Sequence, residues 1–326
     1  MAANTMIDPP RSADDTDGRS HNVLGAVLAG VGALLLVAGL MVHFYVVPAL
    51  AVVPIDQNSV TSLAAKGATV FDTATLAPIT TDLSVSARTV GDVKASEKAP
   101  DNTVVWVGTT TVKSADGVIR SQSTKRAAFN ETTAEAVNCC GNFYSTAEGV
   151  RTPVTRSGLM FKFPFNTEKK NYQVWDDSLA KPVTTRYKGT AKTDGNTTWV
   201  FENTVPATVV GTQDVPGSLF GLASNDNVTA EDYYQNHNTY YVEPITGAIV
   251  NQVTSTKTWF SYQGTDLVTT QATIAYTPKE IKETYDTLGN QPALLSLAQG
   301  PLPWLVALIG LGMIVGGFLI GRRRES

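Results

Sequence analysis

Two long apolar blocks, one near each end of the chain, constrain the fold more than any other feature. Residues 23–47 and 302–320 contain no Lys, Arg, Asp or Glu. A helix needs about 20 predominantly apolar residues to cross a bilayer, so each block predicts a transmembrane helix. The first block is much longer than the h-region of a cleaved secretory signal, about 7–15 residues. It therefore predicts an uncleaved anchor.

Basic residues predict the orientation of these helices. Arg11 and Arg19 precede the first block, no Lys or Arg follows until Lys66, and three arginines at 322–324 close the second. Because Lys and Arg mark the cytoplasmic side, we expect a two-pass protein of the cytoplasmic membrane with both termini inside. The predicted organisation is a cytoplasmic tail over 1–22, helices over 23–47 and 302–321, an extracytoplasmic domain over 48–301, and a second tail over 322–326.

Small residues in the apolar blocks predict that the two helices pack closely, because glycine allows two membrane helices to approach. The second block offers Gly312, Gly316, Gly317 and Gly321 at overlapping four-residue spacings, and the first offers the pairs Ala26/Gly30 and Ala29/Ala33 as partners.

The middle of the chain alternates apolar and polar residues between turn signals, which is typical of antiparallel strands. Leu267–Tyr276 shows the clearest alternation. The strands expected to pair are 68–75 with 80–89, 103–113 with 118–129, and 184–191 with 197–205, followed by a meander of 239–243, 248–262 and 267–276. The predicted fold class is mainly β: an antiparallel β-rich extracytoplasmic domain flanked by two transmembrane α-helices.

One short helix is predicted near the end of this domain. Thr277 is a capping residue, Pro278 suits the first helical position, Glu280 follows at the third, and Gly289 ends the segment.

Few residues suggest catalysis. His237 is the one histidine of the middle domain, His21 lies in the tail and His43 in the first apolar block. Either a Ser–His–Asp triad or a histidine metal site would need His237, and its tyrosine-rich surroundings favour a structural role. The carboxylate pairs Asp176-Asp177 and Glu231-Asp232 could in principle form an acid–base pair. The turn composition around Asp176 favours a structural or solvated role there. We therefore expect no enzyme, catalytic residue, cofactor or metal, and the net charge of −4 argues against a nucleic-acid partner.

Cys139 and Cys140 are the only cysteines and are adjacent. Cysteines outside the cytoplasm tend to oxidise, although adjacent Cα atoms, about 3.8 Å apart, lie below the usual disulfide range. A vicinal disulfide is the favoured interpretation, with an intermolecular bridge and a redox function as alternatives.

Several separated motifs give the chain a family resemblance. They are FKFPFNTEKK at 161–170 with Trp175-Asp176 after it, NCCG at 138–141, YVEPITG at 241–247, and the paired terminal helices. In their order along the chain, these motifs resemble the actinobacterial PorA-type porin family, also called DUF3068. The resemblance implies a membrane protein of the cell envelope and supplies no catalytic residues.

This architecture suggests a non-enzymatic envelope protein that binds or transports hydrophobic molecules or solutes, in contact with membrane lipids and with a hydrophobic ligand or envelope glycolipid as a partner. A structural scaffold and a hydrolase of envelope polymers are the alternatives. Apolar cargo requires an unfilled interior, for which Trp199, Phe201, Val268 and Ile274 are the expected lining residues.

Overall fold

The computed structural model describes residues 15–146, 149–223 and 226–322, with side chains from Val23 onward. The chain divides into a helical unit, which includes residues up to Leu50 and from Ala293, and a β unit over Ala51–Pro292. Arg11, Arg323 and Arg324, on which the predicted orientation partly rests, lie outside the described residues.

The helical unit contains the two apolar blocks. Its elements are α1 (Asp15–Met41), the π-helical turn η1 (Val42–Val46), α2 (Val47–Leu50), α5 (Gln291–Gln299), which begins just before Ala293, and α6 (Leu302–Arg322). The helical segments Val23–Leu50 and Leu302–Arg322 are long and apolar enough to cross a membrane. The first extends three residues beyond the predicted end at 47, and α5 was not expected from the sequence.

The β unit consists mainly of long strands. They are β1 (Asn58–Asp72), β2 (Ala77–Gly91), β3 (Thr103–Ser114), β4 (Ile119–Asn130), β5 (Ala136–Val137), β6 (Phe143–Ser145), β7 (Thr152–Pro153), β8 (Tyr172–Asp176), β9 (Lys181–Thr193), β10 (Asn196–Pro216), β11 (Asn227–Val242), β12 (Ile249–Tyr262) and β13 (Thr265–Tyr276). Short helices α3 (Val93–Ser96), η2 (Gly217–Phe220) and α4 (Pro278–Leu288) connect or follow them.

The strands form one antiparallel sheet in the order β7-β6-β4-β3-β2-β1-β13-β12-β11-β10-β9-β8, with β5 also paired to β4. The mainly β, antiparallel fold class is therefore confirmed. The predicted hairpins and the β11–β12–β13 meander pair as expected. Three strands are much longer than predicted. β1 begins at Asn58 instead of 68, and β11 begins at Asn227 instead of 239. β10 continues to Pro216 instead of ending near Pro206, and a bulge between Val205 and Thr208 accommodates that proline.

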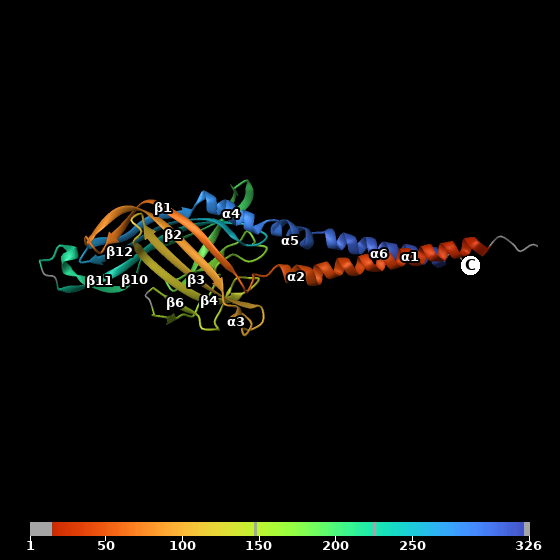
Figure 1. Ribbon diagram of the computed structural model, residues 1–326, viewed down its shortest axis with the longest axis horizontal. Coiled ribbons are helices and arrows are strands. Elements are labelled where there is room, and N and C mark those ends of the chain that lie inside the picture. The colour runs from red at the N-terminus through yellow and green to blue at the C-terminus, as the bar shows by residue number, and fades with distance from the viewer. Residues whose placement is uncertain (1–14, 147–148, 224–225, 323–326) are drawn as a thin grey trace, which may run out of the picture. The chain divides into compact units, whose positions relative to one another are not determined.

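The sheet curls until its two ends approach each other. Figure 1 shows β1 to β4 passing in front of β10 to β12. Leu159 makes a bridge to Glu135, which precedes β5, and a second bridge to Val174 in β8. One residue thus links the first and last parts of the sheet.

Aromatic side chains fill the end of the β unit at which the chain enters from Ala51, which we call the proximal end. The entering segment is fixed there, because the Trp106 indole donates to the Pro54 carbonyl at 3.0 Å and Val53 N donates to Glu131 O at 3.1 Å. Trp106 and Phe129 form an edge-to-face pair with centroids 5.0 Å apart. A separate small cluster of Ala65, Ala68, Val70, Leu83 and Ala272 lies farther along the sheet.

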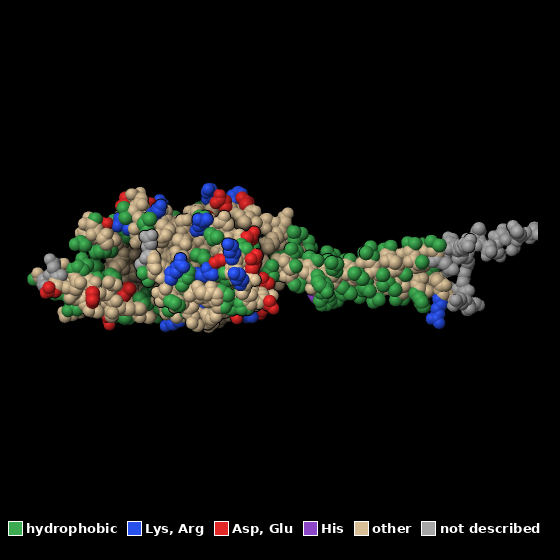
Figure 2. Space-filling view, turned by 60° about the horizontal axis from the view of Figure 1, so that its bottom comes forward, with side chains coloured by type: hydrophobic (Ala, Val, Ile, Leu, Met, Phe, Trp, Pro, Cys, Tyr) green, Lys and Arg blue, Asp and Glu red, His purple; other side chains and the backbone are tan. Residues whose placement is uncertain are grey.

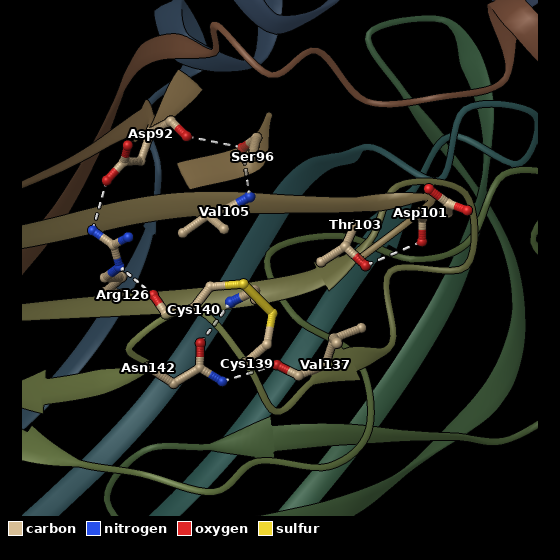
Figure 3. The surroundings of a disulfide bond; sticks show 11 residues. Asp92, Ser96, Asp101, Thr103, Val105, Arg126, Val137, Cys139, Cys140 and Asn142 are labelled. Atoms are coloured by element: carbon tan, nitrogen blue, oxygen red, sulfur yellow. Dashed lines mark hydrogen bonds and ion pairs between the residues drawn. A yellow bond between two sulfur atoms is a disulfide. The ribbon is translucent and has the colours of Figure 1, made fainter. Parts of the chain in front are cut away.

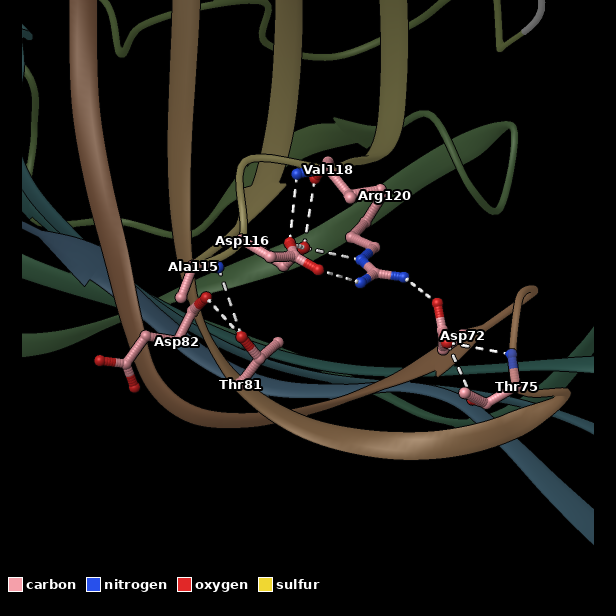
Figure 4. Close-up of polar contacts among 9 residues, drawn as sticks. Asp72, Thr75, Thr81, Asp82, Ala115, Asp116, Val118 and Arg120 are labelled. Atoms are coloured by element: carbon pink, nitrogen blue, oxygen red, sulfur yellow. Dashed lines mark hydrogen bonds and ion pairs between the residues drawn. The ribbon is translucent and has the colours of Figure 1, made fainter.

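Arg120 joins two hairpins at the opposite, distal end (Figure 4). Its guanidinium contacts Asp72 at 2.7 Å, Asp116 at 3.1 Å and the Ser114 hydroxyl at 2.7 Å. Asp72 ends β1, and Asp116 lies in the turn between β3 and β4. Arg120 therefore fixes the tip of the β1–β2 hairpin against the tip of the β3–β4 hairpin. Hydrogen bonds from Arg120 and Thr75 lower the pKa of Asp72 to about 2.

Candidate functional site

Two motifs noted in the sequence, far apart along the chain, pack against each other at the proximal end. Phe163 N donates to Gly247 O at 2.9 Å, and Asn166 N and Thr167 N donate to Ile245 O and Pro244 O at 2.8 Å. Gly247 has a φ of +72°, and a Cβ there would lie 2.2 Å from the Phe163 carbonyl oxygen. Both the left-handed backbone conformation and the lack of space for a Cβ require glycine at this position. The YVEPITG turn therefore supports the FKFPFNT loop structurally.

The FKFPFNT loop inserts its aromatic rings into the core. Phe163 stacks on Phe201 with centroids 4.7 Å apart and contacts Tyr172 and Tyr240. Both Phe163 and Phe201 are almost completely buried.

Lys162 lies beside these rings with its amine 3.3 Å from the centroid of Phe165. Burial lowers the pKa of Lys162 to about 7, although the charge of Glu243 opposes the shift. Glu243 itself accepts from Ile245 N at 3.1 Å and Thr246 N at 2.7 Å. The loop therefore contains an amine whose protonation changes near neutral pH.

The Asp176-Asp177 pair is divided between two sets of partners. Asp177 contacts Lys125 at 3.3 Å, the fully buried Arg156 at 3.2 Å and the Trp175 indole at 2.9 Å. Burial opposes ionisation of Asp177, but Lys125 and Arg156 outweigh it and lower its pKa.

Asp176 accepts instead from the Tyr234 hydroxyl at 3.0 Å and from Ser178 N and Leu179 N. Burial, followed by the Asp176 charge, raises the pKa of Tyr234. The other pair, Glu231-Asp232, occupies successive positions of β11, which point to opposite faces of the sheet. Neither pair has the shared environment of an acid–base site.

The cysteine loop is held by arginine and asparagine side chains (Figure 3). The sulfur atoms of Cys139 and Cys140 are bonded in the structure. Arg126 donates to Cys140 O at 3.1 Å and pairs with Asp92 at 2.6 Å. Asn142 donates to Val137 O at 2.9 Å. These hydrogen bonds hold the backbone of the cysteine loop in place. The vicinal disulfide in the cell stays a prediction.

His237 lies in an exposed row of polar side chains that crosses the sheet. Thr204, His237, Ser255 and Thr273 are direct cross-strand neighbours on β10, β11, β12 and β13. His237 Nδ1 is 2.9 Å from the Thr204 hydroxyl, and the Ser255 and Thr273 hydroxyls are 3.1 Å apart. Lys66, paired with Asp82 at 2.6 Å, lies beside them on β1.

This row borders a groove of about 420 Å³, which we call the hydroxyl groove. It is lined by Lys66, Gly67, Thr204, Gln235, Asn236, His237, Ser255, Thr256, Lys257, Gln271, Ala272 and Thr273. These described lining residues include no carboxylate, so His237 is not oriented as in a Ser–His–Asp triad. Nor does any cluster of three His, Cys, Asp or Glu suited to a metal occur within residues 15–146, 149–223 and 226–322.

A hydrogen-bonded chain of buried and half-buried amide and hydroxyl groups crosses strands β9 to β12. Gln252 donates to Thr254 at 2.9 Å, Thr254 to Asn238 at 2.7 Å, Asn238 to Asn203 at 3.0 Å, and Asn203 to Thr185 at 2.9 Å. The middle of the sheet is therefore more polar than its proximal end.

The helical unit is built on glycine-to-backbone contact between α1 and α6. A Cβ added at Gly32 would lie 2.5 Å from Gly310 O, and one at Gly25 would lie 2.7 Å from Gly317 O. Gly39 approaches the backbone of Pro303 in the same way, at 2.5 Å. Helix pairing therefore depends on a seven-residue spacing of glycines along α1.

This arrangement corrects part of the packing predicted from the sequence. Gly317 lies in the interface, but a Cβ at Gly312 or Gly321 would meet nothing within 4 Å, and one at Gly316 would meet only Leu28, at 3.7 Å. Gly30 also has open space. The predicted four-residue spacing selected glycines on several faces of α6. The observed contact instead repeats every seven residues, or about two helical turns, along α1.

Comparison with known proteins agrees with the motifs assembled above. The family model described as Porin PorA matches residues 24–319. The chain belongs to the Porin PorA family. A curated relative named Porin PorA, from Corynebacterium amycolatum, is 26% identical over 51% of this chain. The match covers 54% of that relative, so the chain spans about half its length.

Membership of the Porin PorA family places the chain among porin-like proteins of the cell envelope. The matched region covers most of both apolar helices and contains the three sequence motifs that carried the resemblance. Family membership favours a non-enzymatic, channel-like protein.

The four residues expected to line an apolar interior lie in different surroundings. Phe201 is inside the aromatic core, and Ile274 packs on the small cluster around Ala272. Trp199 is half-buried with its ring 6.3 Å from Tyr187, and Val268 pairs with Trp259. The hydroxyl groove was not predicted, although the uninterrupted polar run QNHNT at 235–239 was a visible signal.

Proposed function

We propose that this PorA-family chain is a two-pass protein of the cytoplasmic membrane whose β unit binds small polar solutes outside the cytoplasm, without catalysing a reaction. The helix lengths and the arginine bias of the sequence support the two-pass topology. Figure 2 shows charged side chains gathered on the β unit, as expected for a domain in water.

The hydroxyl groove is the observation that favours polar solutes. Its hydroxyl, amide, imidazole and ammonium groups offer donors and acceptors to a sugar or a small anion. The expected apolar residues Phe201 and Ile274 are in contact with other core side chains, which gives less support to a hydrophobic ligand or an envelope glycolipid. A scaffold role remains the alternative.

Solute binding can be tested with the full chain in lipid nanodiscs. NMR would follow the ring C–H signals of His237, which are assigned by their loss in the His237→Gln variant. The chain would be titrated with glucose and, in a separate experiment, with sodium phosphate. We expect saturable shifts that Thr273→Val weakens, because the row loses a hydroxyl. His43 and His21 are internal references, and equal or absent shifts at all three histidines would contradict solute binding.

Passage of solutes is a separate question that liposome swelling answers. Swelling in the solute that shifts His237 would indicate that several chains assemble a pore, because the apolar helix pair of one chain offers no polar path. Binding without swelling would indicate a receptor.

The topology has its own test. Ser84 is exposed on β2, so Ser84→Cys in a Cys139→Ser/Cys140→Ser background should react with a membrane-impermeant reagent in intact cells. Ser326→Cys in the same background should not. Labelling of the terminal cysteine would reverse the proposed orientation.

A further inference from the structure

A second groove lies along the helical unit, on the side where α1 and α6 leave space. It measures about 740 Å³, within the range of roughly 300–1,000 Å³ typical of ligand pockets. Its lining is Gly25, Ala26 and Ala29 from α1 and Ile314, Gly317, Phe318, Gly321 and Arg322 from α6. Seven of these eight residues carry no polar side-chain atom.

The shape of this groove follows from the glycine contacts. Gly25 and Gly317 bring the two backbones together and form its floor. Phe318, 63% exposed, rises beside it as a wall. Gly321 leaves the end of the groove open, because a Cβ there would meet no atom within 4 Å.

Arg322 gives the groove a charge at one end. It is exposed, and no ion pair to it occurs among the described residues. Basic pockets between membrane helices attract anionic headgroups. An elongated apolar groove that ends in a guanidinium matches a molecule with an alkyl chain and an anionic head.

We propose that this groove binds an anionic phospholipid, with one acyl chain along Gly25, Ala29 and Gly317 and the phosphate at Arg322. The proposal rests on the membrane-spanning part of the proposed function. A second copy of α6 is the competing occupant, but the arginine at the rim favours a lipid headgroup over an identical, equally basic helix end.

Native mass spectrometry of the full chain in a non-ionic detergent tests the proposal. The chain would be offered equal amounts of phosphatidylglycerol and phosphatidylcholine. We expect retention of phosphatidylglycerol in preference to phosphatidylcholine, and excess inorganic phosphate should not displace it, because phosphate lacks the acyl chain.

Two variants separate the roles of the groove and the charge. A Cβ at Gly321 would meet no atom within 4 Å, so Gly321→Leu should fill the end of the groove and remove most retained lipid. Thermal unfolding like that of the unaltered chain would show that the α1–α6 contact is intact. Arg322→Gln should leave lipid bound but reduce the preference for phosphatidylglycerol by about fivefold, since one basic residue near an anionic surface contributes an amount of that order. Arg323 and Arg324 stay unchanged throughout.

Gly312→Leu is the matched control, because Gly312 is also a glycine of α6 with open space around it and does not line the groove. It should bind lipid like the unaltered chain. Equal loss in Gly321→Leu and Gly312→Leu, equal retention of both lipids, or dimers in place of lipid adducts would overturn the proposal. The cysteine-labelling experiment reports separately on whether the helices span the membrane, so failure of the topology is distinguishable from failure of lipid binding.

Discussion

The helical unit and the proximal end of the β unit achieve close packing in opposite ways. In the helical unit, Gly25 and Gly32 have no side chain, and the backbone of α1 lies directly against that of α6. In the β unit, Phe163 and Phe201 fill the space between strands with large rings. A helix pair in lipid gains little from burying apolar side chains and depends on backbone approach, whereas a core in water gains stability from each buried ring.

The comparison predicts that removing a ring damages the β unit and adding a side chain damages the helix pair.

Phe163→Ala should have the largest effect. The ring is 1% exposed and stacks on Phe201, so its loss leaves a cavity that should cost about 3–5 kcal/mol of unfolding free energy. Denaturant unfolding followed by tryptophan fluorescence measures this. Phe220→Ala, at a half-buried position in η2, should cost clearly less, and equal costs would contradict the packing described for the proximal end.

Gly32→Leu should separate α1 from α6. The new side chain would collide with the Gly310 carbonyl and the Ile314 backbone, so overpacking should cost about 1–3 kcal/mol. Thermal unfolding in detergent, followed by the helical circular dichroism signal, is a direct measurement. Gly30→Leu on the same helix has open space and should unfold like the unaltered chain, and a matching loss there would show that the glycine contacts do not hold the pair.

Lys162 should make stability depend on pH. Its folded pKa of about 7 lies below the ordinary 10.5, so the unfolded chain binds more protons between these values. Stability should therefore rise with pH from about 7 toward 10.5. Lys162→Met should flatten this rise in denaturant midpoints measured at several pH values, whereas Lys169→Met, at an exposed position, should keep it.

Arg120→Gln should have the smallest effect, restricted to the distal hairpin tips. Loss of the contacts to Asp72 and Asp116 should speed hydrogen exchange in both turns while the proximal strands stay protected. The pKa of Asp72 is depressed to about 2, so its stabilising contribution is complete above the ordinary value near 3.8 and is lost as pH falls through 2. Faster exchange throughout the sheet would contradict a local role.

The amino-acid sequence by itself determined the two apolar helices, the capped helix α4 and most of the long hairpin strands, but not α5 or the short strands β5 to β8. The long charge-free apolar blocks form helices of membrane-spanning length, strict alternation produces strands, and Asp-Gly at 116–117 closes a hairpin as expected. The capping residue Thr277 accepts from Glu280 N at 3.1 Å, as predicted. These signals are local, since each depends on neighbours within a few residues.

Only the tertiary structure decided which of these residues meet. Glu280, at the third position of α4, accepts from Ser62 N, far away in sequence, at 2.9 Å. Asp176 and Asp177 are adjacent in the chain yet serve Tyr234 and Arg156 separately. Likewise, the glycines in contact are those that face the partner helix, and the polar row around His237 exists only because four strands align in register. Such contacts are set by the mutual placement of whole elements, which no local pattern records.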